Sequence, residues 1–333
     1  MKTTTLFLIL LLAGFQAAAF TPESGHYWDP DEPGTGYTIE IQDNNVFATF
    51  YVYDDDGFPV WYTAQAFLDG NSSFSGRLVY SEGGQCLGCY WSQNNSQYSG
   101  YGTIYIEFLT ETTAEFTVLG VTKTIERFNY YLGDELQKMR GEWQVVSDMT
   151  EYVDYYDYPF FADVIVFEQT EIYEGLYMAT GCRSGSTVDY IGCTDDANYY
   201  NNVAASIVND ELLIIVDHSD THYLAYVVDD GTDQFDGAGF YYRKGTNFDP
   251  ILTNEPGYVT RGFRSASKSF IQTGVGPSVN IPTKSKGWRS LNLPETNTNS
   301  ASSENKKNKA FYDLRKKLEQ YLTEKREKNT ASK

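Results

Sequence analysis

The sequence predicts an all-β protein: two tandem antiparallel meander barrels or sandwiches, then a disordered basic tail with one short helix. Three observations predict this class. Apolar and polar residues alternate with period two in short runs that Gly, Asn, Asp and Pro separate. Tyrosine, which favours strands, makes up 28 of the 333 residues. The pattern fills two stretches, 20–131 and 141–248, each the size of a small eight-stranded barrel.

The first residues have the pattern of an export signal. Lys2 gives a positive start, residues 6–15 are apolar, and Ala17-Ala18-Ala19 resembles a small-residue cleavage site. The apolar run is shorter than the ~20 residues that a membrane span needs. We therefore expect residues 1–19 to be a signal peptide and the mature protein to be exported, periplasmic or extracellular, without a transmembrane segment.

The first module is predicted to be a meander whose strands follow one another through tight turns. Asp54-Asp55-Asp56-Gly57 separates two of these strands. Asp-Gly favours a hairpin turn, whereas a calcium loop would need further oxygen ligands at alternate positions. A plain turn is therefore the favoured interpretation, with a cation site as the alternative. The expected strands are 37–42, 46–53, 61–67, 74–80, 102–108, 114–118 and 123–128.

This module also resembles an uncharacterised family of exported proteobacterial β modules, over about residues 24–130. The family pattern is W-x-P-x-E-x-G-x-G-[FY], then Q, then a Y-x-Y-D-x-x-G-x-P-x-W-Y hairpin. The resemblance implies an exported β module with no assigned reaction. Family members often have Arg where this chain has Thr35. The matching residues are Trp28, Pro30, Glu32, Gly34, Gly36, Tyr37, Gln42, Tyr51, Tyr53, Asp54, Gly57, Pro59, Trp61 and Tyr62.

The second module opens with Gly141-Glu142-Trp143 and is expected to close with Tyr241-Tyr242-Arg243. The first opens with Gly25-His26-Tyr27-Trp28 and closes with Arg127. A Gly-x-Trp on the first strand with an Arg near the last is similar to lipocalin-like (calycin) barrels, in which a guanidinium covers the indole. Residues 151–159 are expected to form a loop or edge strand. The expected strands are 162–168, 175–179, 187–191, 204–208, 212–216, 223–228 and 239–243.

Residues 249–333 form a low-complexity basic tail in which apolar spacing predicts a helix over about 305–328. Residues 261–333 carry 16 Lys+Arg and 6 Asp+Glu, a net of +10, so the rest carries a net of −30. The tail is most simply a solvated segment, and it could also dock on the acidic body or contact anionic lipid. Docking driven by these charges would be strongly salt-sensitive. The acidic body disfavours nucleic-acid binding.

The four cysteines are predicted to form disulfides because the chain is expected to be exported. Three pairings are possible. Proximity in sequence favours Cys86 with Cys89 and Cys182 with Cys193. The Cys86-Leu87-Gly88-Cys89 motif could instead be redox-active, but no helical pattern follows it to lower a thiol pKa.

One loop combines metal-ligating residues: Asp217, His218, Asp220 and His222. Both residue types bind zinc, so a zinc site is one hypothesis for this loop. A plain hairpin loop is favoured, because no third convergent ligand is visible. The sequence has no nucleophile elbow, phosphate loop or dinucleotide fingerprint. We therefore expect no catalytic residues and no cofactor.

The expected function is binding, or a structural role in the cell envelope, without catalysis. Four aromatic residues are the tentative ligand-binding residues: Trp61, Tyr62, Trp91 and Tyr101. Their partner would be a small molecule, a glycan or an envelope protein. The alternative for these side chains is a place in the cores, above all for Trp61. The alternative function is a secreted hydrolase or metal-dependent enzyme that uses the His218/His222 loop or paired carboxylates.

Overall fold

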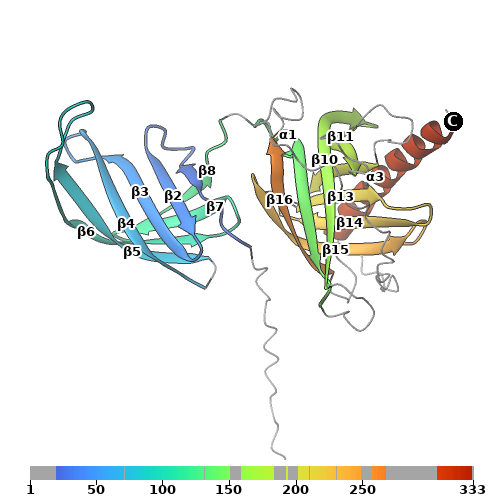
Figure 1. Ribbon diagram of the computed structural model, residues 1–333, viewed down its shortest axis with the longest axis horizontal. Coiled ribbons are helices and arrows are strands. Elements are labelled where there is room, and N and C mark those ends of the chain that lie inside the picture. The colour runs from blue at the N-terminus through green and yellow to red at the C-terminus, as the bar shows by residue number, and fades with distance from the viewer. Residues whose placement is uncertain are drawn as a thin grey trace, which may run out of the picture.

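The computed structural model describes residues 20–70, 72–130, 132–150, 159–183, 193, 202–209, 211–229, 231–248, 257–267 and 306–331. Two closed antiparallel eight-stranded barrels follow one another, and a long helix lies on the second (Figure 1). The predicted fold class is therefore confirmed, with barrels rather than sandwiches.

The first barrel runs in simple meander order and closes by pairing of its first and last strands. Its inner face is apolar at every second residue, as Val46, Ala48 and Phe50 illustrate. This alternation fills the interior with side chains. The strands are β1 (Gly25–Trp28), β2 (Gly36–Gln42), β3 (Asn45–Tyr53), β4 (Pro59–Asp69), β5 (Ser73–Gly83), β6 (Asn94–Phe108), β7 (Thr113–Val118) and β8 (Val121–Arg127).

The second barrel has the same order and closes between its last and first strands. Its closing strand, β16, lies beyond the boundary expected at residue 248, so the barrel takes part of the predicted tail. The expected strand at 187–191 and most of the loop at 151–159 fall outside the described residues. The strands are β9 (Gly141–Asp148), β10 (Phe160–Tyr173), β11 (Leu176–Arg183), β12 (Val203–Val208), β13 (Glu211–Asp217), β14 (His222–Val228), β15 (Gln234–Arg243) and β16 (Tyr258–Ser267).

An arginine on the last strand covers an aromatic residue on the first strand of the second barrel. The guanidinium of Arg264 lies over the Trp143 ring and donates to the carbonyls of Lys138, Arg140 and Thr232. Arg243, which the sequence favoured for this place, is exposed at the end of β15. The prediction was wrong because β16 could not be recognised in a stretch with weak alternation.

In the strand pairing of the first barrel, a tyrosine and Arg127 take the places that Trp143 and Arg264 have in the second. Tyr27 is fully buried and pairs in register with Arg127, whereas the neighbouring Trp28 is only partly buried. A side chain at Gly25 would collide with Arg127, just as one at Gly141 would collide with Arg264 and the Ala266 carbonyl. Each glycine therefore gives its arginine room to cross the first strand.

The two barrels meet at these arginine-covered ends. Glu23, just before β1, accepts three backbone hydrogen bonds from the β14–β15 turn, at the N–H groups of residues 232, 233 and 234. Arg127 pairs with both Glu23 and Asp233. The opposite end of each barrel therefore points away from the joint.

The predicted tail helix is present as α3 (Lys306–Ala331), and it packs on the outside of the second barrel (Figure 1). Phe311, Leu314, Leu318, Tyr321 and Leu322 are buried against the outward side chains of β11–β15. A short helix, α1 (Glu135–Lys138), connects the barrels and is capped by Asp134. Neither helix, within the described residues, has the length and apolar character that crossing a membrane requires.

Candidate functional site

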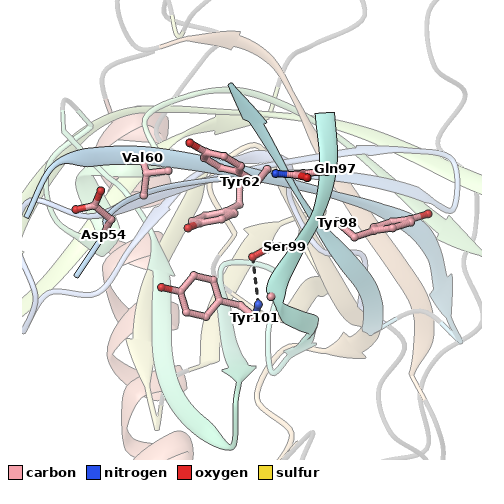
Figure 2. A pocket seen from close by; sticks show the side chains of 9 residues that line it. Asp54, Val60, Tyr62, Gln97, Tyr98, Ser99 and Tyr101 are labelled. Carbon is pink, nitrogen blue, oxygen red and sulfur yellow. Dashed lines mark hydrogen bonds between the residues drawn. The ribbon is translucent and has the colours of Figure 1, made fainter. Parts of the chain in front are cut away.

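A recess opens on the first barrel at the end remote from the joint (Figure 2). It has a volume of about 320 Å³, at the lower end of the range of small-molecule sites. Four segments contribute to it: the β3–β4 turn, β4, β5 and the first half of β6. We call it the tyrosine recess, and its lining residues are Asp54, Val60, Tyr62, Tyr80, Gln97, Tyr98, Ser99, Gly100 and Tyr101.

The rim of the recess is built by the acidic turn after β3. One carboxylate oxygen of Asp54 accepts hydrogen bonds from the backbone N–H groups of Asp56 and Phe58, at 3.0 and 2.8 Å. Gly57 has a positive φ of 80° and donates to the Asp54 carbonyl. The stretch is therefore the hairpin turn that the sequence favoured, and it holds the Asp54 carboxylate beside the tyrosines.

Three tyrosines form the walls. The ring centre of Tyr62 lies 5.9 Å from that of Tyr80 and 5.6 Å from that of Tyr101. The Tyr62 and Tyr101 rings are almost perpendicular, at 87°. Burial raises the pKa of Tyr62, and the neighbouring phenols of Tyr101 and Tyr80 and the charge of Asp54 raise it further. The Tyr62 phenol therefore stays protonated at neutral pH.

The other aromatic residue of the lining faces away. In Figure 2 the Tyr98 ring points away from Tyr62 and Tyr101. On the outer side of the sheet, the Arg77 guanidinium lies over it at 3.8 Å from the ring centre. The cation–π contact between Arg77 and Tyr98 therefore lies outside the recess. The lining of the recess itself contains neither Lys nor Arg.

Two of the four aromatic residues predicted to bind a ligand line the recess, and two do not. Tyr62 and Tyr101 face it. Trp61 lies on the outer face of β4 opposite Tyr51 and is 47% exposed, so it fills no core. Trp91 lies in the β5–β6 turn and is 74% exposed. Strand alternation explains the division between Trp61 and Tyr62, because neighbouring residues point to opposite faces.

A polar cluster lies inside the second barrel, toward the end remote from the joint. Arg183 makes a double contact with Asp163, at 2.6 and 2.7 Å, and donates to Nδ1 of His218 at 2.7 Å. The Tyr226 hydroxyl donates to the same Asp163 carboxylate. We call these four residues the Arg183 cluster. Burial and then the Arg183 charge lower the pKa of His218 to about 4, so the imidazole is neutral at pH 7.

The residues of the predicted metal loop diverge. Asp217 points outward and binds Lys244 and Arg326, and Asp220 also binds Arg326. His218 and His222 point inward, where both rings contact Tyr241. In the described part of the chain no three His, Cys, Asp or Glu side chains converge as metal ligands would. The alternation along β13 and β14 separates the aspartates from the histidines.

Both predicted disulfide pairs are present: Cys86 with Cys89, and Cys182 with Cys193. The first lies in the exposed β5–β6 turn. The second lies at the end of β11, next to Arg183 in sequence. The local pairing favoured by spacing is therefore confirmed.

Sequence reasoning missed Tyr80, Gln97 and Ser99 in the recess. Tyr80 shares its face with Phe74, so extending the alternation of that strand would have found it. Residues 94–101 are polar and rich in Ser and Asn, and they showed no strand pattern. Asp163 and Arg183 were also missed, because their contact depends on the register of the β10–β11 hairpin, in which Arg183 lies opposite Ile165.

No protein-family model, curated protein or solved structure matches this chain.

Proposed function

We propose that this chain is an exported, non-catalytic binding protein that takes a small ligand in the tyrosine recess of its first barrel. The observation that carries the proposal is the convergence of Tyr62, Tyr80 and Tyr101 around an open recess, next to a single carboxylate. Aromatic walls with a few polar groups are typical of ligand sites.

The chemistry of the lining supports binding rather than catalysis. Asp54 is its only carboxylate, and its lining includes no His, Cys or Lys. One acid without a second acid–base group or a nucleophile gives no obvious route for proton transfer.

The test is a fragment titration of the chain from residue 20 onward, followed by NMR of ¹³C-labelled tyrosine rings. Binding fragments should shift the resonances of Tyr62, Tyr80 and Tyr101, and Tyr101→Leu should remove these shifts. The proposal would be overturned by binding that leaves these rings unchanged in the wild-type chain, or by a set of fragments that shifts only rings of the second barrel such as Tyr241.

A second candidate function is hydrolysis at the Arg183 cluster, which combines a carboxylate, an imidazole and a phenol inside a barrel. Its imidazole is poorly suited to act as a base. The Arg183 guanidinium occupies Nδ1, and the low His218 pKa makes the ring a weak proton acceptor. Hydrolysis of an ester or glycoside panel that His218→Gln abolishes would favour this candidate over binding alone.

A further inference from the structure

The tyrosine recess has the chemistry of a site for an organic cation. Resting on the binding function proposed above, we infer that its ligand class is the quaternary ammonium group, held against the faces of Tyr62, Tyr80 and Tyr101 with Asp54 at the rim.

The ring arrangement is the first argument. Aromatic faces attract cations because the ring quadrupole is negative above and below the plane. Rings at an angle to one another can direct several faces toward one point, whereas stacked rings cannot. Tyr62 stands at 87° to Tyr101 and at 43° to Tyr80, and the three come from three neighbouring strands. The Tyr62 ring is thus inclined to both of its neighbours rather than stacked on them.

The charge around the recess is the second argument. Asp54 is the only carboxylate of the lining, which has no basic side chain, and only one of its oxygens is engaged by the hydrogen bonds of the turn. Residues 20–130 carry 15 Asp+Glu and 3 Lys+Arg, a net of −12. This field attracts cations and repels anions such as phosphates and acidic sugars.

The type of cation follows from hydrogen bonding. A primary ammonium loses strong hydrogen bonds to water on entering an aromatic site and needs several acceptors in return. A quaternary ammonium has no N–H group, so its desolvation is less costly and ring faces suffice. The acceptors in the recess are the Asp54 carboxylate, the Gln97 amide, the phenol oxygens and the Ser99 hydroxyl, which already accepts from the Tyr101 N–H. Its three ring faces need no N–H group on the ligand, which favours the quaternary ammonium.

The test uses calorimetric or NMR titration of the chain from residue 20 onward, at constant ionic strength. The probes are tetramethylammonium, choline and 3,3-dimethyl-1-butanol, which is the uncharged isostere of choline. Both cations should bind, and the alcohol should bind at least about tenfold more weakly. Equal affinity for the alcohol would overturn the inference while leaving the recess as a binding site. Absence of cation binding would overturn it as well, and the fragment titration then decides separately whether the recess binds anything.

Matched variants assign the binding to the recess. Tyr101→Leu should abolish it, and Tyr101→Phe should retain it because the ring face remains. Tyr105→Leu is the control, since Tyr105 lies on the same strand with similar exposure, 40% against 37%, but outside the lining. Asp54→Asn should weaken cation binding several-fold while its amide oxygen still caps the turn. Equal effects of the Tyr101→Leu and Tyr105→Leu changes would contradict the assignment.

One further experiment distinguishes a cation on a lipid headgroup from a cation on a free solute. Flotation with phosphatidylcholine vesicles, compared between the wild-type chain and Tyr101→Leu, tests for a lipid headgroup. Flotation that depends on Tyr101 would assign the site to the headgroup, and choline binding without flotation would assign it to a free solute. Flotation of both chains alike, together with no binding of free choline, would contradict the inference.

Discussion

The guanidinium of Arg264 lies 4.3 Å from the centre of the Trp143 ring. The two residues are in register on the last and first strands of the second barrel, so their contact joins the two ends of the sheet. The same guanidinium donates to the carbonyls of residues 138, 140 and 232. It thereby ties the closing strand to the connection between the barrels and to the β14–β15 turn at the joint.

Replacing this arginine should destabilise the second barrel. Arg264→Met keeps the length of the side chain but leaves the carbonyls without their donor, and it removes the cation–π contact. We expect a loss of about 2–4 kcal/mol in the free energy of unfolding. Urea unfolding followed by the fluorescence of the buried Trp143 measures it.

Arg243→Met is the matched control, because Arg243 is exposed on the neighbouring strand. Its effect should stay within about 0.5 kcal/mol. Equal losses from the two variants would show that the Arg264 contacts do not determine the stability of the closure.

The joint between the barrels should weaken as the pH rises. Glu111 is buried there, and burial together with the neighbouring Asp229 and Asp236 raises its pKa to about 8. Burial also raises the pKa of Asp229, Asp236 and Glu23, although Arg127 acts in the opposite direction on Glu23. A raised pKa means that the folded state holds a proton that the unfolded chain releases above its ordinary pKa of 4.5. This stabilisation is full below that value and is lost as the pH rises through about 8.

The expected result is a lower free energy of unfolding at about pH 8.5 than at about pH 5.5, with a difference that shrinks in Glu111→Gln. Urea unfolding at both pH values measures it. Glu40→Gln, an exposed residue of β2, is the control and should keep the wild-type pH dependence. A pH dependence unchanged by Glu111→Gln would mean that other groups cause it.

Helix α3 should be held mainly by apolar burial. Leu318 is fully buried between the helix and the barrel, so Leu318→Ala should cost about 2–5 kcal/mol. Limited proteolysis of 306–331 and urea unfolding would both report the loss. Lys309→Ala, an exposed change in the same helix, should leave both measurements unchanged.

The same packing predicts a modest response to salt, in contrast to the charge-driven docking considered from the sequence. Raising the ionic strength from 0.1 to 1 M shortens the Debye length from about 10 to about 3 Å, yet the buried apolar side chains should keep the helix protected. Partly buried pairs such as Arg326 with Asp217 are screened little. Release of the helix at high salt would contradict this account.

The two disulfides should differ in how easily they are reduced. Cys86 and Cys89 are exposed, whereas Cys182 is buried at 2% exposure. Mild reduction followed by alkylation should therefore label Cys86 and Cys89 first, as mass spectrometry of the peptides would show. Cys182→Ser with Cys193→Ser should cost about 3 kcal/mol on the chain-entropy estimate for a loop of this size. Preferential labelling of Cys182 would contradict the order.

The sequence predicted individual strands better than the residues that meet between them. Alternation placed most strands of both barrels, because burial of one sheet face imposes a period of two. Tyr62 and Tyr101 were proposed as aromatic residues, together with Trp61 and Trp91, which lie outside the recess. Gln97 and Ser99 were missed because the polar half of β6 shows no such period, and Tyr80 was missed although it shares its face of β5 with Phe74.

The C-terminal tail is another case in which the sequence predicted an element but not its contacts. Spacing of apolar residues predicted a helix close to the observed bounds, but not the surface that this helix covers. Leu213 and Ile215 point outward from β13, and with the inward residues they make this strand continuously apolar. From the sequence alone, such a run indicates a strand that is buried on both faces, but not what covers the outer face. Only the packed structure identifies α3 as what covers the outer face.

By itself the sequence determined the class of this protein, the hairpin turn at Asp54 and the pairing of its cysteines, because each depends on residues close together along the chain. Tertiary structure alone decided which arginine closes the second barrel, which tyrosines share a recess, and that the Asp217–His222 loop divides between two faces. Those outcomes depend on strand register and barrel closure, which bring together residues that are distant in sequence.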